Sequence, residues 1–135
     1  MASLINIEGI GPKYAEVLST VGIKSVGALL KAGATVKGRK EIAEKTNISE
    51  KLILEWVNLA DLFRIRGLGE EYTDLLEEAG VDTIVELATR NPANLILKLK
   101  EVNEQKKLVR RLPSVKQVTD WINQAKKLPR MVSYN

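Results

Sequence analysis

The chain has 135 residues, of which 44% are hydrophobic, so it is long enough to bury the core of about one domain. It contains 21 Lys and Arg residues against 17 Asp and Glu residues, with no His and no Cys. These absences exclude Cys/His and Ser-His-Asp catalysis, thiolate and imidazole metal sites, and disulfide bonds. We therefore expect a non-enzymatic, cytoplasmic protein without a cofactor.

The N-terminal sequence MASLINIEGIG lacks the basic segment and the long apolar run of a secretory signal peptide. No other window approaches the run of about eighteen apolar residues that a membrane-spanning helix needs. We expect neither export by a signal peptide nor insertion into a membrane.

Charged side chains are distributed unevenly along the chain. Residues 1–60 carry 8 basic and 6 acidic side chains, residues 61–92 carry 3 and 8, and residues 93–135 carry 10 and 3. The acidic middle and the basic last third would each attract a partner of opposite charge. A run of like charges is, however, more often a solvated helix face.

The first motif is IEGIGPK at residues 7–13. Gly9 and Gly11 flank one apolar residue, which predicts a turn with positive φ that directs Ile10 inward and joins two short helices. Pro12 suits the first position of the second of these helices. A phosphate can approach the uncovered backbone N–H groups there, where the helix dipole favours an anion. The motif predicts a helical hairpin and a possible phosphate cradle.

Two helical segments follow this turn. A stripe at helical spacing, ended by Gly22, predicts a helix, and Ser25 predicts the N-cap of another that ends at Gly33. Next, Ala43, Asn47 and Ile53 have helix-turn-helix spacing. The face that would meet DNA mixes acidic and basic residues, so we interpret this pair as a structural corner. The apolar stripe of the first helix consists of Tyr14, Val17, Leu18 and Val21. The residues of the helical corner that we expect to face the core are Ile53, Trp56, Val57 and Ala60.

The first motif has an echo 58 positions later, IRGLGEE at residues 65–71. Its Glu70 and Glu71 stand where Pro12 and Lys13 stand in the first motif. Carboxylates there would repel a phosphate, although they suit a helix N-terminus because of its dipole. We interpret the second hairpin as structural or as an acidic surface for a protein partner.

The repeat extends to later segments, because residues 49–60 match residues 114–125 at an offset of 65. The second copy has therefore gained seven residues, which we place within residues 92–113. We expect an all-α, compact array of about eight to ten short helices from two unequal helix-hairpin-helix repeats, in one domain. The predicted ranges are 1–135 for the domain, 1–61 and 62–128 for the repeats, and 129–135 for a loosely ordered tail.

The basic last third supplies a second candidate site. Thr83 with Glu86 predicts a capping box, and Asn91 before Pro92 predicts the start of a helix that runs through LILKLKEVNEQKKL. If this helix continues, residues 106 and 110, and likewise 107 and 111, are neighbours on one face. Such a cluster would bridge phosphates without reading a base sequence. Its members are Lys106, Lys107, Arg110 and Arg111.

The residues GIGPKYAEVLSTVGI resemble the helix-hairpin-helix motif of DNA-binding proteins that do not read sequence. The whole chain resembles a bacterial and archaeal family, known only as a domain of unknown function, that is built from tandem copies of this motif. The resemblance implies that backbone amides around the second glycine, with a nearby Lys, meet a DNA phosphate. The corresponding residues are Gly9, Ile10, Gly11 and Lys13; Glu8 beside them would oppose a phosphate.

Two functions remain open from the sequence. The first is nonspecific binding of nucleic-acid backbone, with duplex DNA as the partner, through the first hairpin and the basic region. The second is protein interaction or scaffolding, in which the hairpins are purely structural and the acidic second repeat meets a protein. An enzyme is disfavoured, because the acidic residues 70–78 repeat along one helix and no nucleotide or nucleophile motif is present.

Overall fold

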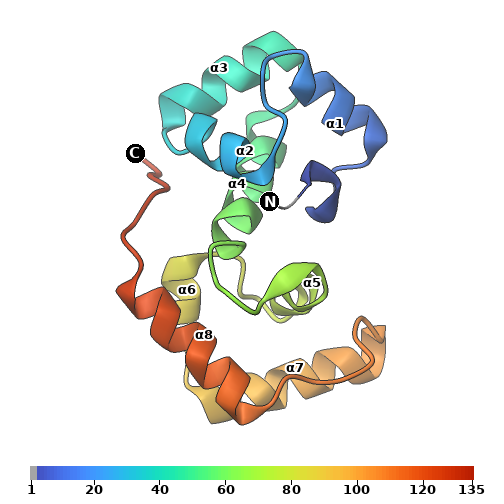
Figure 1. The fold of residues 1–135 in the computed structure, drawn as a ribbon, viewed down its shortest axis with the longest axis vertical. Coiled ribbons are helices and arrows are strands. Elements are labelled where there is room, and N and C mark those ends of the chain that lie inside the picture. The colour runs from blue at the N-terminus through green and yellow to red at the C-terminus, as the bar shows by residue number, and fades with distance from the viewer. Residues whose placement is uncertain (1–2) are drawn as a thin grey trace. The chain divides into compact units, whose positions relative to one another are not determined.

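The structure, a computed structural model, describes residues 3–135 of the chain. These residues form eight α-helices and one 3₁₀ helix, with no strand among them (Figure 1). The predicted all-α class is therefore confirmed. Residues 1 and 2, which the predicted first repeat includes, lie outside the described part of the chain.

Contacts between residues divide the chain into two units, Met1–Asp61 with Arg130–Asn135, and Leu62–Pro129. The first unit is built from η1 (Leu4–Asn6), α1 (Pro12–Ser19), α2 (Val26–Ala32), α3 (Val36–Thr46) and α4 (Glu50–Leu62), of which the last ends one residue inside the second unit. The second unit is built from α5 (Gly69–Glu78), α6 (Ile84–Ala88), α7 (Pro92–Lys106) and α8 (Val115–Lys127).

Local sequence signals start several of these helices. The side chains of Ser25 and Asn91 each accept a backbone N–H at the start of α2 and α7, as predicted. Thr83 also caps α6, but the predicted capping box is wrong. A capping box would require the Glu86 carboxylate to accept the backbone N–H of Thr83. It instead accepts a hydrogen bond from Arg90 Nε at 2.9 Å, because Arg90 lies one helical turn later and carries the opposite charge.

Trp56 of α4 lies at the centre of the first unit, with 1% of its surface exposed. Tyr14 of α1 packs edge-on against it, with ring centroids 5.0 Å apart. The Gly9 backbone lies on the indole, so an added Cβ would come within 3.0 Å of Nε1. The buried indole N–H has no hydrogen-bond partner among the described residues. Core positions predicted on α4 are all buried: Ile53, Trp56, Val57 and Ala60.

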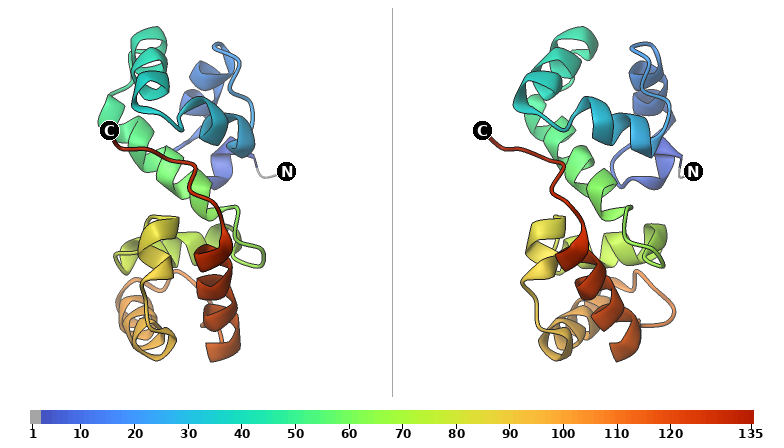
Figure 2. Two further views of the ribbon diagram at one scale, coloured as in Figure 1. Left: turned by 90° about the vertical axis from the view of Figure 1, so that its left-hand side faces the viewer. Right: turned by 60° about the vertical axis from the view of Figure 1, so that its left-hand side comes forward.

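The second unit contains the same three-residue contact. Trp121 of α8 is 1% exposed, and the Tyr72 ring of α5 packs on it with centroids 5.2 Å apart. An added Cβ at Gly67 would lie 3.8 Å from the indole nitrogen, in ordinary contact. Around this contact α8 packs against α6 and α7, while α5 packs against α7 (Figures 1 and 2).

The two glycine turns differ in backbone conformation. Gly9, Gly67 and Gly69 have positive φ, as predicted, but Gly11 has φ −86° and ψ −178°. The positive φ of the first turn is therefore at Gly9 and not at Gly11, because Pro12 follows Gly11 and a residue before proline is held in the extended region. Gly11 therefore serves as the N-cap of α1.

The C-terminal segment also differs from expectation. Residues 130–135 are extended, as predicted, but they are not loose: Val132 is 2% exposed, and Ser133 N–H donates to Ala34 O at 2.8 Å. Figure 2 shows this segment running from the end of α8 to α4. The expectation of a loosely ordered tail failed because its partners lie about a hundred residues away in sequence, where local patterns carry no signal.

We expect Gly9→Ala to lower the free energy of unfolding by about 1–3 kcal/mol, because it places a side chain at φ +94° and against the indole of Trp56. The matched control is Gly11→Ala, whose Cβ meets nothing within 4 Å. Its effect should stay below about 1 kcal/mol, the difference between glycine and alanine at an N-cap. Urea unfolding followed by Trp fluorescence measures both values, and equal losses would contradict the role given to Gly9.

Candidate nucleic-acid interface

The first turn presents its backbone, not its apolar side chain, to solvent. Ile10 is 3% exposed and its N–H donates to Ile7 O at 3.0 Å, which closes the turn. Gly9, Gly11 and Lys13 are exposed. Of the four predicted contact residues in this turn, Ile10 can therefore contribute only main-chain atoms.

The N-terminus of α1 lacks the side-chain cap that most helices of this chain have. Ser, Thr or Asn oxygens accept an amide at the starts of α2, α3, α4, α6, α7 and α8. In α1 the cap position is Gly11, which has no side chain, and the first intrahelical bond runs from Ala15 N–H to Gly11 O. The N–H groups of Lys13 and Tyr14, which come before Ala15, therefore have no carbonyl acceptor within the helix. Such amides, at the positive end of the dipole, suit an anion.

The predicted helix through the basic cluster does not continue. α7 ends at Lys106, and Lys107 adopts a left-handed conformation with φ 50°. The Asn103 side chain then holds the returning chain by two bonds to Val109, accepting its N–H at 3.0 Å and donating to its carbonyl at 3.1 Å. Val109 is consequently buried. The expected i,i+4 pairing of the four basic residues is wrong, because this hydrogen-bonded reversal replaces the next helical turn.

The basic segment, residues 106–111, instead lies against α5. Lys106 Nζ forms an ion pair with Glu78 at 3.1 Å, and the Tyr72 hydroxyl donates to the Arg111 carbonyl at 3.1 Å. Lys107, Arg110 and Arg111 have exposed side chains. The segment therefore offers three solvated cations to a polyanion, while a carboxylate of the acidic helix already binds the fourth.

The second turn is fastened to α8 through its main chain. Gln124 accepts the Arg66 N–H at 2.8 Å and donates to the Arg66 carbonyl at 3.0 Å. After this turn, Glu70 and Glu71 are exposed in the first turn of α5. Like α1, α5 has no side-chain cap. The role of Gln124 was missed from the sequence, because the equivalent position of the first copy is the apolar Leu59 and gives no signal.

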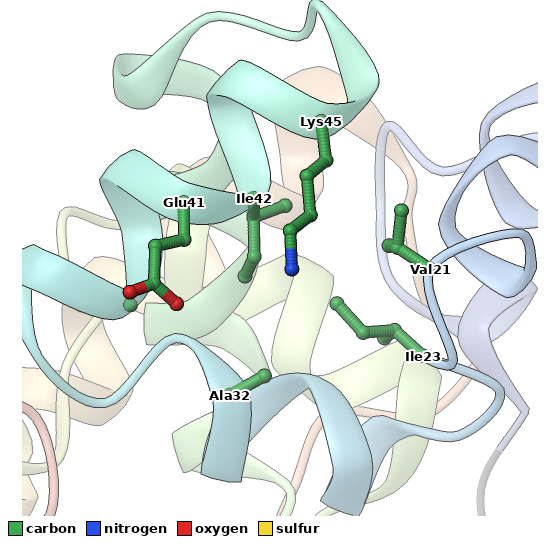
Figure 3. Close-up of a pocket in the computed structure, with 7 residues that line it drawn as sticks. Val21, Ile23, Ala32, Glu41, Ile42 and Lys45 are labelled. Carbon is green, nitrogen blue, oxygen red and sulfur yellow. The ribbon is translucent and has the colours of Figure 1, made fainter.

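A separate pocket of about 180 Å³ lies in the first unit, between α2, α3 and the loop after α1 (Figure 3). Lys45 extends across it, opposite Ala32, and Glu41 lies on its side. None of the predicted contact residues lines it. Within residues 3–135, no group of three or more carboxylates is arranged for a metal ion, and no helix is long and apolar enough to cross a membrane. The lining residues are Val21, Ile23, Ala32, Gly38, Glu41, Ile42 and Lys45.

Buried polar residues outside the predicted sites were also missed. Arg39 is 5% exposed, and desolvation by burial lowers its pKa. Asn58, Asp61 and Thr73 are buried as well. Arg39 and Asn58 bind the C-terminal segment, at sequence separations that no local pattern indicates.

Comparison with known protein families identifies one that matches the chain. Residues 8–128 match the family described as Domain of unknown function (DUF4332), and the chain belongs to that family. No solved structure matches the chain. The family match covers both turns and the basic segment.

We expect Lys107→Gly to raise the free energy of unfolding by about 0.5 kcal/mol. A left-handed residue with a Cβ costs about 1–2 kcal/mol, and glycine removes this cost while adding chain entropy worth about 0.5–1 kcal/mol. The control is Lys106→Gly at the last residue of the helix, which should be destabilising by about 1 kcal/mol, because glycine has a low helix propensity and removes the ion pair with Glu78. Thermal unfolding followed by circular dichroism compares the two, and a loss of stability in both would contradict the assigned helix end.

Proposed function

We propose that this chain is a non-enzymatic protein that binds the backbone of nucleic acid, with duplex DNA as its partner and without reading base sequence. The uncapped start of α1 carries the proposal: a Gly-Ile-Gly turn whose apolar residue is buried, followed by open amides and the exposed Lys13. This arrangement supports the interpretation of residues 4–31 as a helix-hairpin-helix motif. Backbone amides and one Lys recognise a phosphate but no base edge.

The first turn is the better phosphate site of the two. Both turns precede a helix without a side-chain cap, so the amides do not distinguish them. The second has two carboxylates, Glu70 and Glu71, at the helix start, whereas the first has Pro12 and Lys13. Glu8 beside the first turn leaves a single opposing charge. The same Gly–Trp–Tyr contact in both units supports the further proposal that they are two copies of one motif.

The exposed cations of the basic segment supply a second proposed contact. Lys107, Arg110 and Arg111 lie in the second unit, and Gly9 to Lys13 lie in the first. Each unit therefore brings its own contact to the nucleic-acid backbone. Binding of this kind weakens with salt by about 0.9 log units of affinity per log unit of salt for each phosphate neutralised.

The double substitution Gly11→Val with Lys13→Glu tests the first turn. Nothing lies within 4 Å of a Cβ at Gly11 and its φ is negative, so the valine should fold but cover the amides. We expect duplex affinity to fall at least about tenfold at low salt, since one phosphate contact is lost and one charge is reversed. Fluorescence anisotropy with labelled duplex DNA, single-stranded DNA and duplex RNA measures it.

The matched control is Lys37→Glu, an identical charge change at an exposed position of α3. It should lower affinity much less and leave the salt slope of the wild-type protein unchanged. A folded double variant that binds duplex DNA as tightly as the Lys37→Glu control would refute contact through the first turn. Absence of wild-type binding even at low salt would refute the nucleic-acid function as a whole.

The second candidate function is protein interaction through the acidic helix α5. It is favoured by the ion pair between Glu78 and Lys106, because the same helix also exposes Glu70 and Glu71, which a basic partner can reach. Glu70→Lys with Glu71→Lys should then remove a partner that co-purifies with the wild-type chain. An unaltered set of co-purifying proteins, determined by mass spectrometry, would count against this surface.

A further inference from the structure

The C-terminal segment, Arg130–Asn135, binds the first unit as an extended peptide binds a receptor. Ser133 uses both sides of its main chain: its N–H donates to Ala34 O at 2.8 Å, and its carbonyl accepts from Arg39 Nη2 at 2.6 Å. The preceding Val132 is 2% exposed, so its side chain is buried when the segment is bound. The following Tyr134 hydroxyl donates to Asn58 Oδ1 at 2.7 Å.

Arg39 is the centre of this C-terminal groove, which we define by Gly33, Ala34, Arg39 and Asn58. Its guanidinium donates to two main-chain carbonyls, Gly33 O at 2.7 Å from one side of the groove and Ser133 O from the segment. It also lies 6.0 Å from the centre of the Tyr134 ring, a cation–π distance. A buried guanidinium is costly unless its donors are paired, so the segment satisfies a charge that the groove alone leaves half satisfied.

Residues within the segment preorganise it for the groove. Arg130 Nε donates to Val132 O at 3.2 Å, and its guanidinium lies 5.6 Å from the Tyr134 ring centre. The two arginines thus approach one aromatic ring, one from the groove and one from the segment. The recognised pattern is an aliphatic residue, a residue read by its main chain, and a tyrosine. None of these contacts takes part in the proposed nucleic-acid binding.

We propose that the C-terminal groove is a peptide-binding site, and that it accepts the C-terminal segment of a second copy of this chain as well as its own. Every copy carries one groove and one segment that fits it, joined to α8 only through residues 128 and 129. Exchange therefore reforms the same contacts between copies without unfolding a helix, which is the low-cost route to a symmetric dimer. The chain's own segment is favoured at low protein concentration, because its effective concentration at the groove is high.

The first test uses the full chain with Val132→Glu, which disables the segment by charging its buried residue and leaves the groove unchanged. A labelled peptide of sequence LPRMVSYN, residues 128–135, is titrated by fluorescence anisotropy. We expect it to bind the variant at least about tenfold more tightly than the wild-type chain, whose own segment occupies the groove most of the time. The control is the same peptide with Glu in place of Val132, which should not bind either protein.

The second test asks whether whole chains exchange segments. Full-length Arg39→Gln disables the groove and keeps the segment, so it complements Val132→Glu. Analytical ultracentrifugation should find a one-to-one heterodimer in the mixture and monomers in each separate sample. A folded Val132→Glu protein that does not bind the peptide would overturn the groove as a binding site. Peptide binding without a heterodimer would overturn exchange between copies.

Each of the two tests has a second variant in case the first one does not fold. If Val132→Glu does not fold, Ser133→Pro replaces it, because proline removes the N–H that donates to Ala34 O. If Arg39→Gln does not fold, Asn58→Leu replaces it, because leucine cannot accept the Tyr134 hydroxyl. Circular dichroism on each full-length variant decides which protein enters the titration.

Discussion

The close approach of a glycine to a tryptophan sets the geometry of both units. In the first, a main chain without a Cβ rests on the buried indole of Trp56, and Tyr14 covers the edge of the same ring. In the second, Gly67, Trp121 and Tyr72 repeat the arrangement. Because the turn comes before the first helix of a unit and the tryptophan belongs to its last helix, this contact joins the two ends of the unit. The orientation of each turn depends on it.

One result of this anchoring is that the turn faces solvent with its main chain. An apolar residue between two glycines must be buried to hold the turn, as Ile10 and Leu68 are, so only backbone and the following side chains remain outside. The residue after the second glycine then decides the character of the surface. In the first turn, Pro12 holds Gly11 in an extended conformation, and the helix that follows has no acidic residue in its first turn. In the second, Gly69 is left-handed and Glu70 follows it.

Features set by neighbours in sequence were predictable, and features set by distant partners were not. Pro12, Ser25 and Asn91 mark helix starts because the atoms that cap a helix lie within four residues of it. The end of α7 was missed because the Asn103 side chain competes with the helix for Val109. For the candidate site, the exposed turn and its buried Ile10 followed from spacing. The shielding of Lys106 by Glu78 did not, because nothing local brings α5 to α7.

The division of the chain also bears on the order in which the protein is made. The first unit takes its last six residues from the end of the chain, after the whole second unit has been synthesised. Domains generally fold from the N-terminus as they leave the ribosome. Here Arg39 emerges early, with one of its two carbonyl partners still to be translated. The N-terminal unit can therefore reach its final form only after residues 62–129 have been synthesised, and the second unit is the first whose residues are all available.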